Sequence, residues 1–221
     1  MFSGIFNYDN PVWRFIGKFF DIFVLNLLWI ICSLPLFTIG ASTTAVYYVT
    51  LKLVRDEEGG TIRSFFKSFR ENFRQATAIW LFLLALVIVT GFDIYFFAVL
   101  QPAGGRIRFV MTAVLCGFAL LELGVLLFVF PLQCRFYNPV KRTLLNALLI
   151  AVRHFVWVIV LLALDAAILL IPFFAVPALI PFLFLFGFPL LAFANSFVLV
   201  GILDKYMSKE EENQDGFNAV P

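Results

Sequence analysis

The sequence predicts an all-α, polytopic helical membrane protein with five full spans, a short sixth helix and two amphipathic cytoplasmic interfacial helices. Hydrophobic residues make up 62% of the 221 residues, charged residues only 14%, and the mean hydropathy is +0.99. Soluble domains average about 45–50% apolar and about 25% charged residues. A soluble fold of this length could not bury so much apolar surface, so we expect the solvent around this protein to be lipid.

Five segments contain the ~20 mostly apolar residues that a spanning helix needs. They are residues 15–34, 77–100, 107–130, 155–173 and 178–203. The last contains Pro181, Gly187 and Pro189, which predicts a kinked helix whose freed carbonyl groups find protein or water partners. We therefore expect one transmembrane domain over residues 1–203. The polar segment 204–221 is acidic in its middle and predicts a disordered cytoplasmic tail.

A turn separates the first span from the short helix predicted at 41–55. Pro35 blocks helix continuation, Gly40 permits a tightly packed or left-handed backbone, and Ser42 or Thr43 can cap the next helix. As a helix, 41–55 would be only about 22 Å long at 1.5 Å per residue, whereas the hydrocarbon core is ~30 Å thick. This segment either lies at the interface, which gives five spans, or crosses, which gives six.

The basic residues favour six spans. With five, the 16 Lys and Arg divide 12 inside to 4 outside, and the N-terminus faces outside. With six, the division is 14 to 2, and Arg106 and Arg108 alone remain outside. The positive-inside rule prefers the second division. We expect a multi-pass protein of the cytoplasmic (inner) membrane with its C-terminus, and with six spans also its N-terminus, in the cytoplasm.

Two amphipathic helices are predicted on the cytoplasmic side, at about 61–75 and 139–153. In the first, aromatic and aliphatic residues recur every three or four positions, and basic residues repeat at the same spacing on another face, namely Arg63, Lys67, Arg70 and Arg74. In the second, Asn138 is a candidate N-cap and Pro139 suits the first helical position. Both helices suit anchoring at anionic headgroups, and the basic face equally suits docking of a cytoplasmic partner.

Carboxylic acids inside or near the spans form the candidate intramembrane polar site. They are Asp21, Asp93, Glu122 and Asp165, of which Glu122 and Asp165 lie deepest, each about mid-helix. An ionisable group in a span is by default a candidate functional group, because burying its charge in lipid is costly. Such a group can line a polar cavity, relay protons or contact a substrate. It can also do no more than form a hydrogen bond between helices. Asn26 is also included in this candidate site; it and Asn195 are polar groups at similar depth, and such groups often join helices.

The sequence contains no catalytic constellation that we recognise, so we expect no enzyme. It contains no HExxH, GxSxG or P-loop motif. The three cysteines are widely spaced and His154 is the one histidine, so no zinc-site spacing exists, and we expect no metal and no cofactor. The net charge is only +2, which gives no reason to expect a nucleic-acid partner. The oligomeric state is left open.

The chain resembles, over nearly its whole length and most specifically over residues 21–77, the YesL-like family of small bacterial polytopic membrane proteins, a family defined by a domain of unknown function. The resemblance lies in "LNLLWIICSLPLFTIGASTTAVYYVTLKLVRDEEG" followed by "SFFKSFRENFRQAT". Its signature turn consists of Pro35, Thr38, Gly40 and Thr43, and Asn26, Trp29 and Asn72 also fit the pattern. Beyond residue 80 the resemblance rests on hydropathy and length.

The resemblance implies an accessory or regulatory component associated with carbohydrate (oligosaccharide) import, because such proteins are often encoded beside binding-protein-dependent sugar importers. The expected partners are the lipid bilayer and a sugar ABC-import system. The chain lacks the loop that import permeases insert into their ATPases, so we do not expect a permease. The alternative is a small secondary carrier or channel that uses the mid-membrane carboxylates.

Overall fold

The computed structural model describes residues 11–57, 59–100, 105–136 and 138–218, and this part of the chain is helical with no β-strand. Its elements are α1 (Pro11–Ser33), η1 (Leu36–Thr38), α2 (Ile39–Val54), α3 (Thr61–Tyr95), η2 (Phe96–Leu100), α4 (Arg106–Arg135), α5 (Val140–Arg153), α6 (Phe155–Phe174), η3 (Pro177–Leu179) and α7 (Ile180–Asn218). The predicted all-α class is confirmed.

Five helical segments are long and apolar enough to cross a membrane. They are Ile16–Ser33, Thr61–Leu100, Arg106–Arg135, Phe155–Phe174 and Pro177–Tyr206. Most residues of these segments are exposed. In the most apolar 18-residue stretch of each segment, the buried share is lowest, 11%, in Thr61–Leu100 and highest, 39%, in Arg106–Arg135. Exposed apolar helix surface on this scale suits a lipid environment.

The short helix α2 lies at the centre of the fold. It has 16 residues, and its side chains from Gly40 to Leu51 are buried with the exception of the half-buried Tyr48. It packs against α1, α3, α4 and α7, so neighbours surround it on all sides. The predicted short helix at 41–55 is therefore an internal core helix, and its apolar residues contact protein.

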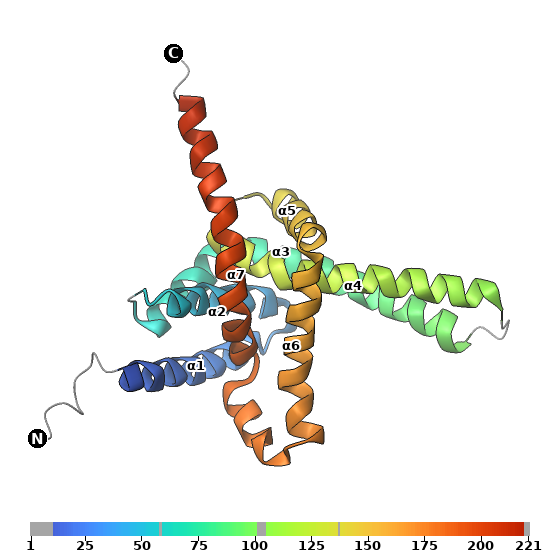
Figure 1. Ribbon diagram of the computed structural model, residues 1–221, viewed down its shortest axis with the longest axis horizontal. Helices are drawn as coiled ribbons and strands as arrows, with labels where there is room; N and C mark the ends of the chain where they lie inside the picture. Colours follow the sequence, from blue (N-terminus) through green and yellow to red (C-terminus); the bar gives the residue numbers. More distant parts are fainter. Residues whose placement is uncertain (1–10, 58, 101–104, 137, 219–221) are drawn as a thin grey trace, which may run out of the picture.

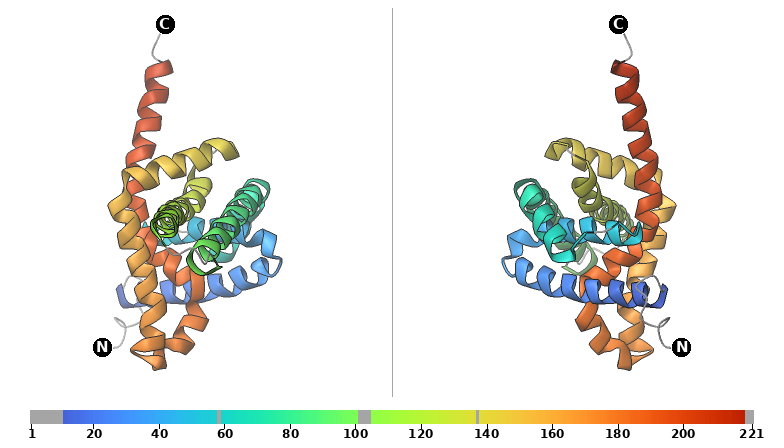
Figure 2. Two further views of the ribbon diagram at one scale, coloured as in Figure 1. Left: turned by 90° about the vertical axis from the view of Figure 1, so that its right-hand side faces the viewer. Right: turned by 90° about the vertical axis from the view of Figure 1, so that its left-hand side faces the viewer.

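Two helical hairpins project from this core in different directions (Figure 1). The α3–α4 hairpin extends to the right in Figure 1, and the α6–α7 hairpin extends downward. In the views of Figure 2 the α3–α4 hairpin is seen nearly end-on, while α6 and α7 run vertically and α5 crosses above. The core around α2 thus lies where the two hairpins meet.

The signature turn connects α1 to α2, and two of its residues, Thr38 and Gly40, make the contacts that hold it in place. Thr38 Oγ1 lies within donor distance of the carbonyl oxygens of Cys32 (2.6 Å) and Pro35 (2.7 Å), and the Pro35 oxygen also accepts from the Thr38 backbone N–H at 2.9 Å. A Cβ on Gly40 would lie 2.5 Å from the carbonyl oxygen of Ala76 and from the Cβ of Trp80, so α2 contacts the α3 backbone directly here. Neither Ser42 nor Thr43 caps α2, because the helix already begins at Ile39.

The predicted kink in the last span is confirmed at Gly187, whose φ of 39° and ψ of −136° interrupt α7. Pro189 lacks an N–H, so the carbonyl oxygen of Leu185 loses its helical donor, and the turn at Gly187 frees that of Phe184 as well. Asn26 Nδ2, from α1, donates to these two oxygens at 2.9 and 3.0 Å. The freed carbonyl groups therefore find a protein partner.

Three element boundaries differ from those expected. Segments 61–75 and 77–95 form one continuous helix, α3. Helix α5 begins at Val140 with Pro139 as its N-cap, so Asn138 is not the cap. The composition predicts disorder from residue 204, but α7 continues to Asn218. Residues 204–215 contain neither Pro nor Gly, and Lys, Glu and Met favour helix, so nothing in that segment ends the helix earlier.

Candidate functional site

The four candidate acids lie in four separate environments. Glu122, on α4, is 6% exposed and accepts a hydrogen bond of 2.7 Å from the buried hydroxyl of Thr90 on α3. This bond joins the two helices of the α3–α4 hairpin across a buried contact. Glu122 is not among the residues that line the pocket at Asp165, so the two deepest acids do not meet in that pocket.

Asp21 lies within α1, next to the N-terminal end of α3. It accepts a hydrogen bond of 2.6 Å from Thr61 Oγ1, at the first residue of α3. An ion pair of 2.7 Å between Lys18 and Asp56 lies close by in the sequence. Asp93 is half-buried on α3, and its carboxylate forms no hydrogen bond or ion pair with any other residue that the structure describes. The structure therefore gives Asp21 a helix-joining contact and leaves Asp93 apart from the other acids.

Asp165 is the candidate acid that lies in a pocket. Asn195 Nδ2, on α7, donates to Asp165 Oδ1 at 3.0 Å and to Oδ2 at 3.1 Å. Both residues line a pocket of about 300 Å³, which we call the Asp165 pocket. Its other lining residues are Trp29, Ile39, Thr43, Tyr47, Trp80, Leu123, Leu126, Leu127, Phe130, Leu162, Phe188 and Leu191.

Aromatic rings with fixed orientations form much of this pocket. The Trp29 ring stacks on Phe188 with centroids 5.1 Å apart, and Tyr47 meets Phe188 edge-on at 6.0 Å. The Trp29 indole N–H donates to Thr43 Oγ1 at 3.3 Å, and that of Trp80 donates to the carbonyl oxygen of Leu36 at 2.8 Å. Both indole N–H groups are thus satisfied by acceptors of the protein itself, and the rings present apolar surface to the pocket.

Sequence reasoning did not find this aromatic lining. Tyr47, Trp80 and Phe188 belong to three different helices, and each looks like one more apolar residue in an apolar run. Two features of the sequence could have indicated the pocket. One is Asn195, a second polar residue at depth, 30 residues from Asp165. The other is Gly187 with Pro189, which mark the irregular backbone next to Phe188. Polar residues near a broken helix are a known pointer to sites inside membrane proteins.

The basic face predicted on the first amphipathic segment is exposed. Arg63, Lys67, Arg70 and Arg74 all lie at the surface of α3, and we call them the basic surface. None of the four forms an ion pair with another described residue. Of the neighbouring apolar residues, Phe65 is fully buried in the core, while Ile62 is 54% and Phe66 is 38% exposed. The surface thus offers four cations beside two exposed apolar side chains.

A polar network lies beside the basic surface and holds α3 to α4. Gln133 is 4% exposed, and its Nε2 donates to Gln75 Oε1 at 2.6 Å and to Asn72 Oδ1 at 3.3 Å. Asn72 in turn donates to the carbonyl oxygen of Ser68 at 3.1 Å. Asn72, which the family resemblance emphasises, therefore has a structural role at this helix contact.

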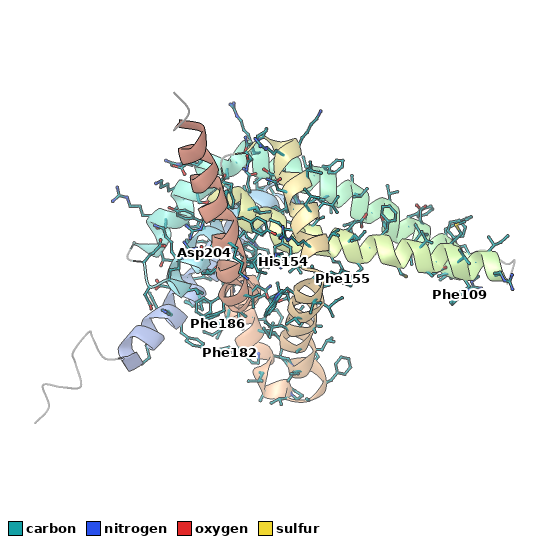
Figure 3. The ribbon with its side chains drawn as sticks, turned by 45° about the horizontal axis from the view of Figure 1, so that its top comes forward. Phe109, His154, Phe155, Phe182, Phe186 and Asp204 are labelled. Carbon is teal, nitrogen blue, oxygen red and sulfur yellow. The ribbon has the colours of Figure 1, made fainter. Side chains whose placement is uncertain are left out.

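His154 lies at the junction of α5 and α6, outside the spanning segments, as Figure 3 shows beside Phe155. Its Nε2 forms a hydrogen bond of 3.1 Å with the Tyr206 hydroxyl on α7. Partial burial lowers the pKa of His154 below its ordinary value, and the positive charges of Arg153 and Lys205 lower it further. The imidazole therefore favours its neutral form. Among the described residues, no group of three His, Cys, Asp or Glu side chains could hold a metal ion.

Five apolar spanning-length helices around a central buried helix, with polar groups set between them, define a multi-pass helical membrane protein. Residues 22–94 match the family described as "Protein of unknown function, DUF624". The match covers α1 from Ile22, the signature turn, α2 and nearly all of α3, and it supports the expected similarity to a family defined by a domain of unknown function. No curated protein matches the chain. No solved structure matches it either.

Proposed function

We propose that the protein is an accessory or regulatory component of carbohydrate (oligosaccharide) import in the cytoplasmic membrane, as its resemblance to the YesL-like family implies. The observation that carries this proposal is the basic surface. Four cations lie exposed on one helix without internal ion pairs, and such groups attract a complementary acidic surface. The proposed partner is a subunit of a sugar ABC-import system that approaches from the cytoplasm.

The orientation of this surface follows from the charge distribution. Both the five-span and the six-span interpretations place α3's first turns in the cytoplasm, and with six spans 14 of the 16 basic residues lie inside, the division that the positive-inside rule prefers. The exposed Ile62 and Phe66 next to the cations provide apolar contact area. Docking surfaces combine such apolar anchors with a charged rim. Anionic lipid headgroups also suit four cations, so the experiment must separate protein contact from lipid contact.

Site-specific photo-crosslinking in intact cells makes this separation. A photoreactive residue replaces Arg70 in the basic surface, and in a matched control it replaces Phe109, which lies near the far end of the α3–α4 hairpin (Figure 3). We expect position 70, and not position 109, to crosslink to an importer subunit identified by mass spectrometry. Arg63→Glu with Arg74→Glu should abolish the crosslink, whereas Arg106→Glu should not. Lipid adducts alone at both positions would contradict the proposal.

The carrier alternative has one specific observation in its favour. The break at Gly187 lies next to Phe188, which lines the Asp165 pocket, and broken helices beside a polar group are typical of transporter sites. The separation of Glu122 from this pocket speaks against a relay that uses both acids. In proteoliposomes, a carrier should give sugar or proton flux that Asp165→Asn abolishes and Glu122→Gln preserves. No flux in the unsubstituted protein would rule it out.

A further inference from the structure

The Asp165 pocket has one buried hydrogen-bond acceptor that no described residue satisfies. Asn195 is 1% exposed, and its Oδ1 has no hydrogen-bond partner among the described residues. The orientation of its amide is set by Asp165, because reversing it would direct the amide oxygen at the carboxylate oxygens in place of Nδ2. The unsatisfied atom is therefore an acceptor. A buried acceptor without a donor is costly, so the pocket calls for a ligand with N–H or O–H groups.

The carboxylate of Asp165 also lacks a positive partner. None of the residues that line the pocket is Lys, Arg or His. Asn195 supplies two hydrogen bonds to the carboxylate but no charge. A carboxylate in an apolar setting is stabilised strongly by a cation that it also hydrogen-bonds. Asp165 is itself only partly buried, so a ligand can reach it.

The other residues that line the pocket are mostly apolar, so the part of the ligand that lies against them should be hydrocarbon. The rings of Trp29, Tyr47 and Phe188 and the leucines of α4 provide almost all of the remaining surface. Aromatic rings pack well against hydrocarbon and attract cations to their faces. The volume of about 300 Å³ suits a small molecule. A sugar, with hydroxyl groups on every side, would leave most of them unsatisfied in this pocket.

We propose that the Asp165 pocket binds a small primary amine with an apolar body. Its ammonium group donates to the Asp165 carboxylate and to Asn195 Oδ1, and its hydrocarbon part lies against the Trp29–Phe188 stack. An ammonium group has one positive charge and three donors, which matches an unpaired carboxylate next to an unsatisfied amide oxygen. This binding does not depend on the accessory role proposed above, nor on transport, so it can be tested without either.

The test compares two probes of equal length in the full-length protein. n-Hexylamine and n-hexanol are titrated calorimetrically into phosphatidylcholine nanodiscs that contain the protein, and the heats from empty nanodiscs are subtracted. We expect saturable binding of hexylamine with an affinity at least about tenfold above that of hexanol, because the amine alone forms charge-assisted hydrogen bonds. Equal affinities, or no saturable binding of hexylamine, would overturn the proposal. This comparison needs no variant, so misfolding of a mutant cannot obscure it.

Matched variants then locate the site. Asp165→Asn should reduce the preference for the amine to near unity and leave hexanol binding unchanged. Glu122→Gln removes the other deep carboxylate, which lies outside the pocket, and should preserve the preference. A preference that survives Asp165→Asn, or that Glu122→Gln removes equally, would contradict the assignment.

The natural amine can come from the water phase or from a lipid headgroup, and a second nanodisc composition distinguishes these sources. Phosphatidylethanolamine carries a primary ammonium group. If that headgroup enters the pocket, nanodiscs rich in this lipid should weaken hexylamine binding at least about tenfold by competition. If the affinity is unchanged, the ligand is a free amine. Either result keeps the amine specificity, which the comparison with hexanol establishes.

Discussion

Gly40 shows how a single position determines the contact between α2 and α3. The atoms that a Cβ would meet are the carbonyl oxygen of Ala76 and the Cβ of Trp80, both at 2.5 Å. Neither can rotate away, because one belongs to the backbone and the other is attached directly to it. A methyl group at residue 40 would therefore push the two helices apart. Small residues at such contacts are the usual means of close helix packing in membranes.

We predict that Gly40→Ala destabilises the protein by about 1–3 kcal/mol, the range for inserting a methyl group into a packed interface. Thermal unfolding in mild detergent measures the change. The matched control is Gly17→Ala on α1, where a Cβ meets no atom within 4 Å, and where Ala should stabilise the helix by about 0.5–1 kcal/mol. Equal effects of the two substitutions would show that the contact with Ala76 does not limit packing.

His154 makes folding stability depend on pH in a defined direction. Burial, Arg153 and Lys205 lower its pKa in the folded protein, while the unfolded chain keeps a value of about 6.5. The unfolded state thus binds the proton first as the pH falls, and the free energy of unfolding decreases from about pH 6.5 down to the folded pKa. The contribution is complete above pH 6.5 and is lost in acid.

We predict that the melting temperature decreases between pH 7.5 and pH 5.5, and that His154→Gln reduces this decrease. His154 is the one histidine of the chain, so the variant removes imidazole titration entirely. Tyr206→Phe is the control, since it removes the hydrogen-bond partner but keeps the titrating group. If His154→Gln shows the same pH dependence as the unsubstituted protein, another group is responsible.

At the scale of elements, the interrupted helix α7 depends on a side chain from α1. Asn26 is 2% exposed, and it supplies the two hydrogen bonds that the break at Gly187 removes from the backbone. The positive φ of Gly187 favours glycine, and a Cβ there would also collide with the Asn26 amide. The break and its partner therefore form one unit, even though 159 residues separate Asn26 from Leu185.

We predict that Asn26→Leu destabilises the protein by roughly 2–4 kcal/mol, because it leaves two carbonyl groups without a donor and each costs about 1–3 kcal/mol. Thermal unfolding in detergent reports the loss. Asn146→Leu on α5 is the control. Asn146 is half-buried and forms no hydrogen bond with another described residue, so its substitution should change stability by less than about 0.5 kcal/mol. Similar losses at both positions would contradict this role for Asn26.

Some elements could be predicted from sequence and others could not, for a physical reason. Hydropathy located the spanning helices, and Pro35, Gly187 and Pro189 located the breaks, because proline and glycine act on their own backbone. Partners across the fold could not be predicted. In lipid, the outside of a helix is as apolar as the inside, so periodicity does not show which face is buried. For this reason the burial of α2 and the pairing of Asp165 with Asn195 required the structure.

At the scale of the whole molecule, polar contacts gather three distant parts of the chain at one end. Lys18 in the first half of α1 pairs with Asp56, and Asp21 accepts a hydrogen bond from Thr61. Arg55 in turn forms an ion pair with Asp204 on α7. The first half of α1, the connection from α2 to α3 and the end of the apolar part of α7 therefore lie together. Such an arrangement supports the proposal that both termini are on the same side of the membrane.

We predict that single cysteines at Ser3 and Ser208 react alike with a membrane-impermeant maleimide, and that one at Arg106 reacts from the opposite side. Ser3 lies outside the described residues, and Arg106 is exposed at the start of α4. The background protein has Cys32, Cys116 and Cys134 replaced. Labelling in whole cells and in inverted vesicles gives the sides. Opposite labelling of positions 3 and 208 would instead support five crossings.

The central position of α2 has a consequence for how the protein is made. The α2 hydroxyl of Thr50 lies 2.9 Å from that of Ser196, a residue synthesised 146 positions later. Until α7 leaves the ribosome, α2 lacks its neighbour on that side, and because lipid hydrocarbon offers no hydrogen-bond partners, the insertion machinery must cover the polar groups there. We expect assembly to be completed only at the end of translation, with chains truncated before α7 recognised as immature and degraded by membrane proteases.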